Sequence, residues 1–184
     1  MNTSNRFKTF FQGGFIALFL VAGLFSGCQK EELPPSAQEN LERVLSNVDP
    51  VQLNSDIAVI DDSLDMWGLA DMVLKEPNGV RYLIDSTGSG NRPVLENIVE
   101  INYSGRLMST GEEFDSGENV SFILANLIAG FQTTLPLVPT GSRVTLFIPS
   151  GLGYGPNDVP DAAGNIVVPA NSNLIFEVDL LDIF

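Results

Sequence analysis

Apolar and polar residues alternate over the second half of the chain. Apolar side chains occupy every second position in residues 80–84, 99–103, 144–148 and 174–180, and most of the residues between them are polar. This spacing places the apolar side chains on one face of a β-strand. Strands with one apolar face favour an antiparallel sheet that is covered on one side. We therefore predict an α+β fold for residues 77–184, with a short helix near residues 125–132 as the cover.

Residues before this region have helical spacing. Leu41, Val44, Leu45 and Val48 follow the i, i+3, i+4, i+7 pattern and predict a short amphipathic helix, which Pro50 interrupts. A second apolar stripe, residues 53–67, ends before Gly68, a common helix stop. The sequence thus predicts an N-terminal helical segment before the sheet.

The other face of the second predicted helix is acidic. It carries four aspartates: Asp56, Asp61, Asp62 and Asp65. We expect a solvated helix face. The alternative is a cation site at Asp61 and Asp65, which stand at i and i+4, although further oxygen ligands would be needed.

The first 28 residues have the pattern of an export signal. Arg6 and Lys8 precede a short apolar stretch, residues 13–25, which is shorter than the roughly 20 residues that a spanning helix needs. The sequence LFSGC, residues 24–28, resembles a lipobox, so we expect Cys28 to be lipidated, with palmitate among its acyl chains. An ordinary cleaved signal peptide is the alternative.

Residues 29–32, QKEE, follow this cysteine. A lysine and two acids at that place resemble the surface-export signal of some outer-membrane lipoproteins, and a solvated charge run is the alternative. We expect an outer-membrane lipoprotein of the bacterial cell envelope, displayed at the cell surface if this resemblance holds. The predicted organisation is a signal peptide at 1–28, a linker with a short helix at 29–50, a helical extension at 51–76 and a folded domain at 77–184.

Composition excludes several kinds of chemistry. The net charge of −14 disfavours nucleic acid and anionic lipid surfaces as partners, so membrane attachment would depend on the lipid anchor. The chain has no histidine, which excludes Ser-His-Asp catalysis and histidine-based metal sites. The single cysteine allows no internal disulfide. We expect neither a cofactor nor a metal.

Single residues identify no active site. Tyr103 reads as a strand tyrosine, and Asp115, before Ser116-Gly117, reads as a turn former. The aromatic residues Phe114, Phe122, Phe131 and Phe176 read as core. Tyr154, between two glycines on a predicted loop, is harder to assign to packing.

Five segments in order change this interpretation. They read INYSGRLMSTGEEFDSG from 101, VSFILANLIAGF from 120, GSRVTLFIP from 141, PSGLGYG from 149 and VVPANSNLIFEVDLLDIF from 167. In this order they resemble the successive blocks of FKBP-type peptidyl-prolyl cis-trans isomerases, over residues 95–184. The resemblance implies a twisted antiparallel sheet wrapped around one short helix, with an apolar pocket between them.

The resemblance also implies a set of site residues. The catalytic positions would be Tyr103, Asp115, Ile128 (through its main-chain N–H) and Tyr154. The proline ring of the substrate would be bound by Phe114, Leu127, Phe131, Val167, Val168 and Phe176. Phe131 stands where the family usually has tryptophan, Val120 where an aromatic wall residue is common, and residues 156–166 form a longer connection than usual.

Three functions follow from these observations. The first is a rotamase that assists folding of proline-containing client polypeptides at the cell surface or beyond the inner membrane. The alternative is a binding module that holds proline segments without useful catalysis, or a scaffold of an envelope complex. In a third hypothesis the helical extension dimerises or docks, although we expect its second helix to pack on the domain and the protein to be a monomer.

Overall fold

The computed structural model describes residues 35–184, which belong to one compact unit. The predicted signal peptide, the lipidation of Cys28 and the charge run at 29–32 lie outside the described residues. Among residues 35–184, no helix is both long enough and apolar enough to cross a bilayer.

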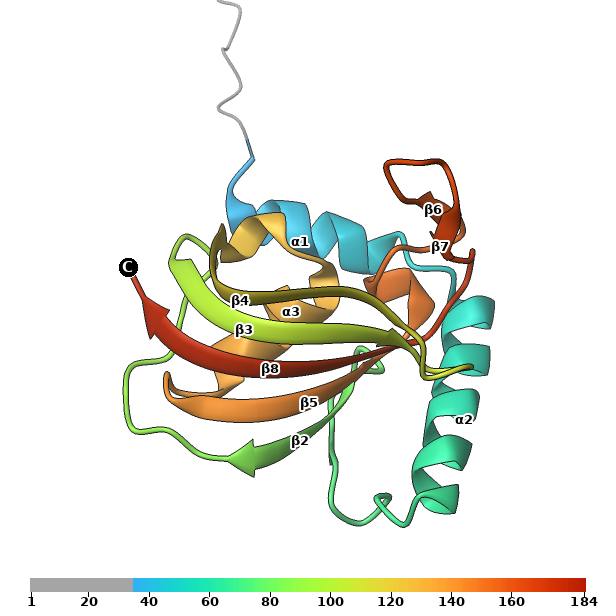
Figure 1. Ribbon diagram of the computed structural model, residues 1–184, viewed down its shortest axis with the longest axis horizontal. Helices are drawn as coiled ribbons and strands as arrows, with labels where there is room; N and C mark the ends of the chain where they lie inside the picture. Colours follow the sequence, from blue (N-terminus) through green and yellow to red (C-terminus); the bar gives the residue numbers. More distant parts are fainter. Residues whose placement is uncertain (1–34) are drawn as a thin grey trace, which may run out of the picture. The chain divides into compact units, whose positions relative to one another are not determined.

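A six-stranded antiparallel sheet forms the body of the fold (Figure 1). Its spatial order is β1 (Leu74–Lys75), β2 (Arg81–Ser86), β5 (Ser142–Ile148), β8 (Leu174–Ile183), β3 (Ile98–Leu107) and β4 (Glu113–Ile123). The short helix α3 (Ala129–Thr134) lies against one face of the curved sheet, next to the 3-10 turns η1 (Leu124–Asn126) and η2 (Leu135–Leu137). The predicted α+β fold is confirmed, with the predicted helix displaced toward residue 134.

The core lies between the sheet and α3. Its fully buried members include Val99, Ile101, Leu146 and Ile148 from the strands and Leu135 after the helix. These strand residues are among those whose alternation predicted the sheet. Burial of one such side chain contributes about 1.5–3 kcal/mol.

Strand β4 was not predicted. The segment around Asp115 reads as a turn, yet it pairs with β3 from Arg106↔Glu113 to Ile98↔Ile123. A bulge absorbs the turn-forming residues: Ile101 pairs with Val120 but Tyr103 pairs with Gly117. Asn119, in the bulge, has φ 51° and donates its N–H to Asn102 Oδ1 at 2.8 Å. Strand β4 lies at the edge of the sheet and has polar residues on both faces, so its sequence lacks the alternation of apolar and polar residues that predicts a strand.

The longer connection after Tyr154 forms a hairpin of its own, β6 (Val159–Pro160) with β7 (Ile166–Val168). Asp161 organises its turn, because its carboxylate accepts hydrogen bonds from the backbone N–H groups of Ala163 (2.8 Å) and Asn165 (2.9 Å). The side-chain amide of Asn165, which donates to Asp161 Oδ2 at 3.0 Å, lowers the pKa of Asp161 most, and the backbone bonds lower it further.

Both predicted N-terminal helices are present. Helix α1 (Ala37–Ser46) begins with a capping box between Ser36 and Glu39, and it buries Leu41 in the main core beside α3. Helix α2 (Pro50–Met66) has Asp49 as its N-cap. Pro50, predicted to interrupt a helix, therefore starts one. A backbone N–H at the first helical position would have no partner within the helix, so proline, which lacks this N–H, fits there.

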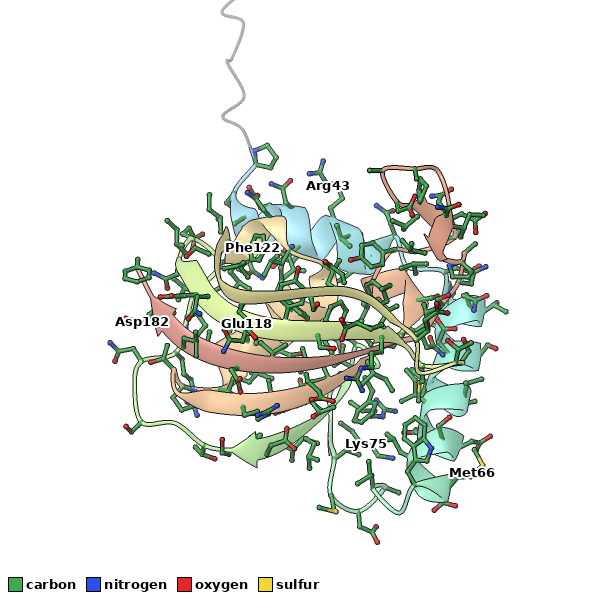
Figure 2. The ribbon with its side chains drawn as sticks, in the orientation of Figure 1. Arg43, Met66, Lys75, Glu118, Phe122 and Asp182 are labelled. Atoms are coloured by element: carbon green, nitrogen blue, oxygen red, sulfur yellow. The ribbon has the colours of Figure 1, made fainter. Side chains whose placement is uncertain are left out.

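Helix α2 packs on the domain through a second core cluster. Ile60 and Leu64 are fully buried with Val73, Met108 and Phe147. Gly68, with φ 71°, follows the helix end as predicted. Ile60 and Leu64 of the apolar stripe are thus buried within the chain. Met66, which does not follow the helical spacing of the stripe, points away from the sheet (Figure 2) and is 77% exposed.

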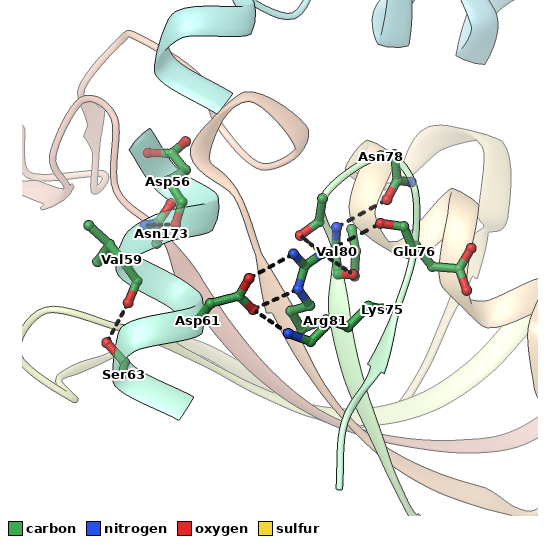
Figure 3. Close-up of polar contacts among 11 residues, drawn as sticks. Asp56, Val59, Asp61, Ser63, Lys75, Glu76, Asn78, Val80, Arg81 and Asn173 are labelled. Atoms are coloured by element: carbon green, nitrogen blue, oxygen red, sulfur yellow. Dashed lines mark hydrogen bonds and ion pairs between the residues drawn. The ribbon is translucent and has the colours of Figure 1, made fainter. Parts of the chain in front are cut away.

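The solvated acidic face predicted for α2 is wrong at two positions. Asp61 accepts hydrogen bonds from Arg81 Nε (2.9 Å) and Nη2 (3.0 Å) and lies 3.3 Å from Lys75 Nζ (Figure 3). Asp56 is only 3% exposed. Both aspartates are engaged by residues that lie far away in the sequence, which the pattern within the helix does not indicate. Among the described residues no group of three or more His, Cys, Asp or Glu side chains could hold a metal ion, and Asp61 is engaged by cationic side chains instead.

Candidate active site

A cavity of about 210 Å³ opens between α3 and the concave face of the sheet. Drug-sized ligands generally occupy pockets of about 300–1,000 Å³, so this one has room for a single small ring with its adjoining backbone. Its lining comprises Ile101, Tyr103, Asp115, Phe122, Leu127, Ile128, Phe131, Tyr154 and Phe176.

Aromatic rings form the bottom of the cavity. Phe131 on α3 and Phe176 on β8 are each 3% exposed, and their rings meet edge to face with centroids 4.9 Å apart. Phe176 pairs across the sheet with Gly105 of β3. A Cβ at Gly105 would lie 2.5 Å from Phe176 Cε1. The Phe176 ring can therefore occupy this place only because residue 105 is glycine.

Phe114 supports the cavity from behind. Its ring packs edge to face on Phe176 (5.6 Å between centroids) and on Tyr154 (6.0 Å). Such aromatic pairs contribute about 0.5–1.5 kcal/mol beyond their buried area. Phe114 thus connects the bottom of the cavity to the tyrosine at its rim.

The rim carries two hydroxyls and a carboxylate. Tyr103 donates its hydroxyl to Asp115 Oδ2 at 2.8 Å, and both strands that carry them, β3 and β4, are paired at this point. Burial, followed by the hydrogen bond and charge of Asp115, raises the pKa of Tyr103 to about 12. Burial and the same carboxylate raise the pKa of Tyr154. Both hydroxyls therefore stay protonated at neutral pH and can donate hydrogen bonds.

A main-chain donor lies beside the rings. Ile128 is the N-cap of α3, with φ −60° and ψ 151°, and within residues 35–184 no protein acceptor is present for its N–H. Gln132 fixes the preceding turn, because its amide donates to the carbonyls of Ala125 (3.1 Å) and Leu127 (2.7 Å). Ile128 thus lines the cavity, and its N–H, which has no protein acceptor among the described residues, can bind a carbonyl.

Tyr154 reaches the rim on a tight loop after η3 (Ser150–Leu152). The carbonyl of Ser150 accepts hydrogen bonds from the N–H groups of Gly153 (3.0 Å) and Gly155 (2.8 Å). Gly155 has φ 73°, a conformation that disfavours other residues. The glycines on either side of Tyr154 therefore serve the loop, and Tyr154 is left 36% exposed at the rim.

Most of the predicted site residues meet at this cavity, but Phe114, Val167 and Val168 do not line it. Val168 is 1% exposed in the core, and Val167 packs against the core from β7. Two lining residues, Ile101 and Phe122, were missed. Ile101 alternates with Tyr103 on the same strand face, which could have identified it. Phe122 supplies an aromatic wall, 6.3 Å from the Tyr103 ring, although Val120 was the position considered for that wall.

Comparison with known proteins agrees with this geometry. The family profile described as FKBP-type peptidyl-prolyl cis-trans isomerase matches residues 90–181, half of the chain. The chain belongs to this family. The FKBP match covers all the strands and the helix that form the cavity, whereas α1, α2, β1 and β2 lie before it.

The relatives include FKBP-type isomerases and a protein that is called an outer membrane protein. The chain is 33% identical over 154 residues to the FKBP-type isomerase FkpA of Buchnera aphidicola from Schizaphis graminum, covering 79% of this chain and 58% of that protein. It is 37% identical over 109 residues to FkpA of Escherichia coli K12, covering 57% of this chain and 38% of the relative. Outer membrane protein MIP of Legionella longbeachae is 33% identical over 111 residues, covering 58% and 45%. The chain thus spans less than two thirds of these relatives.

Solved FKBP structures share the fold. The crystal structure of FkpA from Escherichia coli aligns with a TM-score of 0.57 at 29% identity, covering 79% of this chain and 63% of that one. A peptidyl-prolyl cis-trans isomerase from Pseudomonas syringae aligns with a TM-score of 0.56 at 23% identity, covering 83% and 98%. The predicted FKBP-like fold is confirmed.

Proposed function

We propose that this chain is a peptidyl-prolyl cis-trans isomerase that acts on X–Pro bonds of client polypeptides. The observation that carries the proposal is the cavity of about 210 Å³, which combines an aromatic bottom with three kinds of polar group at its edge. Phe131 and Phe176 offer an apolar site for the proline ring. The Ile128 N–H and the Tyr154 hydroxyl are available to the peptide backbone on either side.

The chemistry requires rotation about an amide bond and no covalent step. The barrier of about 18–20 kcal/mol arises from amide resonance, which is lost in the twisted transition state. A twisted amide is less polar than a planar one, so an apolar pocket favours it over the ground state. Hydrogen bonds from Ile128 and Tyr154 would hold the flanking carbonyls, and interactions that are stronger in the twisted state accelerate the reaction. No cofactor is needed.

The first test is the cis-to-trans rate of short X–Pro peptides with residues 29–184, which retain every contact of the described fold. A double variant, Tyr154→Ala with Asp115→Ala, is the comparison. Wild type should accelerate exchange, and the double variant should be much weaker because the rim has lost its donor and its carboxylate. An inactive wild type that still binds the peptides would refute catalysis.

That result would favour the alternative, a proline-binding module. Phe131 supports the binding module, because the family usually has tryptophan at this position and phenylalanine offers a smaller ring without an indole N–H. Phe131→Trp is the variant that separates the two functions. A gain of peptide affinity without acceleration would indicate a binding module, whereas a gain in turnover would support the enzyme.

We further propose that the chain is an outer-membrane lipoprotein, anchored at Cys28 and serving proline-containing clients of the envelope. The lipobox-like sequence before Cys28 supports the anchor, and one relative, MIP of Legionella longbeachae, is called an outer membrane protein. Labelling cells with an alkyne analogue of palmitate tests the anchor, with Cys28→Ala as the control that should lose the label. Protease treatment of intact cells tests surface display, since an anchored chain that remains uncut would lie inside.

We expect a monomer, because α2 buries Ile60 and Leu64 within its own chain. Light scattering of residues 29–184 tests this expectation. A dimer that dissociates on Val59→Lys would revive the hypothesis that the helical extension dimerises, since Val59 is 52% exposed on α2.

A further inference from the structure

Helix α2 contacts the loop that carries Tyr154. The carboxylate of Asp56 on α2 accepts hydrogen bonds from the backbone N–H of Ser150 (2.9 Å) and from the Ser150 hydroxyl (2.6 Å). Ser150 begins η3, which ends two residues before Tyr154. The two partners are 94 positions apart in the sequence, so the contact joins the N-terminal extension to the isomerase domain.

Asp56 is buried and fully engaged. Its exposed fraction is 3%, and Gln52 donates a third hydrogen bond to its carboxylate at 2.8 Å. A carboxylate is costly to bury unless donors surround it, and an apolar residue often serves stability equally well. Asp56 is thus better suited to fixing the position of Ser150 than to stabilising the fold.

The position of Ser150 determines the position of Tyr154. The Ser150 carbonyl accepts the N–H groups of Gly153 (3.0 Å) and Gly155 (2.8 Å), which flank the tyrosine. Ser150 is only 1% exposed and has little freedom to move. A continuous chain of hydrogen bonds therefore runs from α2 through Ser150 to both neighbours of Tyr154.

Two further contacts strengthen this link. Asn173, just before β8, accepts from the Ser150 N–H at 3.1 Å and donates to the Asp56 carbonyl at 3.4 Å, and Figure 3 shows it beside Asp56. Val48, between α1 and α2, packs so closely on Gly151 that a Cβ there would lie 2.8 Å from Val48 Cγ1. The extension thus holds the loop at two successive residues, Ser150 and Gly151.

We propose that Asp56 is a positioning residue for the proline pocket: through Ser150 it fixes the loop that presents the Tyr154 hydroxyl to the substrate. The N-terminal helical extension is then a working part of the active site. This inference rests on the proposed isomerase function. Phe131 and Phe176, at the bottom of the pocket, take no part in the hydrogen bonds that link Asp56 to Ser150, so the proline ring should bind as before when the link is cut.

The same helix offers a matched control. Asp61 lies five positions after Asp56 and holds α2 to Arg81 on β2, away from the Tyr154 loop. Asp56→Asn and Asp61→Asn each remove one carboxylate with nearly unchanged side-chain volume. Both weaken the docking of α2, but only Asp56→Asn changes one of the two acceptors of Ser150, the other being Asn173.

The experiment compares wild type, Asp56→Asn and Asp61→Asn in residues 29–184, at a temperature at which all three are folded. The readouts are kcat and KM for X–Pro peptides and the hydrogen-exchange rates of the Gly153 and Gly155 amides. Asp56→Asn should lower kcat about fivefold to tenfold, the effect of losing one well-placed donor, with KM within about twofold. Exchange at Gly153 and Gly155 should become faster. Asp61→Asn should change neither.

Should Asp56→Asn fail to fold, Ser150→Ala takes its place, because it removes one of the two bonds and leaves the backbone bond intact. Its expected effects are smaller but in the same direction. Equal kcat and equal exchange in Asp56→Asn and Asp61→Asn would overturn the proposal. If wild type does not accelerate isomerisation, the proposed function fails by itself. The exchange rates of Gly153 and Gly155 then decide whether Asp56 holds the loop.

Discussion

The hydroxyl of Tyr103 donates a 2.8 Å hydrogen bond to Asp115 Oδ2 across the β3–β4 pair. The bond fixes both side chains at the rim and directs the carboxylate toward the cavity that they share. Tyr103 also packs against Phe122 and Phe176. One tyrosine therefore connects the aromatic wall, the cavity bottom and the polar rim.

Replacing Tyr103 with phenylalanine keeps the ring and removes this bond. We expect kcat/KM for X–Pro peptides to fall about threefold to tenfold, which is less than the full contribution of a hydrogen bond to a charged group, about 1.5–3 kcal/mol, would give, because Asp115 regains water in part. Ser104→Ala is the control, because Ser104 bonds Glu113 and not a residue of the cavity. Equal activities of the two variants would show that the Tyr103 hydroxyl has no role in turnover.

Stability should fall at high pH because of the same tyrosine. The folded pKa of Tyr103 is about 12, above the value of about 10 expected in the unfolded chain. The folded state therefore holds its proton more tightly, and this contribution is complete below about pH 10 and disappears as pH rises through 12. Urea unfolding at pH 8 and pH 11 tests this. Tyr103→Phe should lose less stability than wild type over the interval, and an equal loss would contradict the assignment.

Gly105→Ala should damage the pocket without touching a polar group. The added methyl would lie 2.5 Å from Phe176 and 2.9 Å from Phe114, so both rings must shift. We expect a loss of about 1–3 kcal/mol in the free energy of unfolding, as for other overpacked cores, with weaker peptide binding. Peptide titration followed by NMR measures the affinity. Unchanged affinity with displaced Phe176 resonances would argue against the Phe176 ring as the proline site.

Asp61→Asn should reveal what holds α2 to the sheet. Its bidentate bond with Arg81, followed by its pairing with Lys75, lowers the pKa of Asp61, and the Arg81 side chain is only 8% exposed. The variant should lose about 1–3 kcal/mol at pH 7, between the values for surface and buried pairs. A carboxylate with a lowered pKa stabilises the fold above its unfolded pKa, about 3.9, and this contribution is lost as pH falls through its lower folded pKa. The thermal unfolding temperatures of wild type and variant should therefore approach each other as pH is lowered below about 4.

Gln132→Leu should loosen the donor at the N-cap of α3. The side-chain amide of Gln132 satisfies the carbonyls of Ala125 and Leu127, and losing such bonds costs about 0.5–1.5 kcal/mol each. The Ile128 N–H would then be held less firmly, which should raise KM more than it lowers kcat. Thr133→Ala, whose hydroxyl bonds only within α3, is the control. A larger loss of kcat than of affinity would contradict this role.

Local signals in the sequence predicted much of this architecture. Period-two alternation located β2, β3, β5 and β8, because each of these strands buries one face against α3 or the second core. Helical spacing located α1 and α2, and the N-cap of Asp49 explains why Pro50 begins a helix instead of ending one. The site residues followed from the order of five family blocks, since only Tyr154, between two glycines, had a distinctive local pattern.

Local sequence patterns do not indicate contacts between residues that lie far apart in the chain. Asp56 has the helical spacing of a solvated residue, and its partner Ser150 lies 94 positions away. Asp115 reads as a turn former because short polar residues favour turns, and only its pairing with β3 makes it part of a strand. Nothing in the sequence around Gly105 indicates that the absence of a side chain there makes room for Phe176.

Strand β8 lies between β5 and β3 in the middle of the sheet, although it comes last in the chain. A ribosome releases the N-terminal residues first, so the two halves of the sheet are made well before the strand that joins them. Proteolysis or premature termination before residue 174 would leave β3–β4 and β2–β5 without their common neighbour and Phe131 without Phe176. The proline pocket can therefore form only after β8 has been made, and products that lack β8 should be recognisable to quality-control proteases as unfolded.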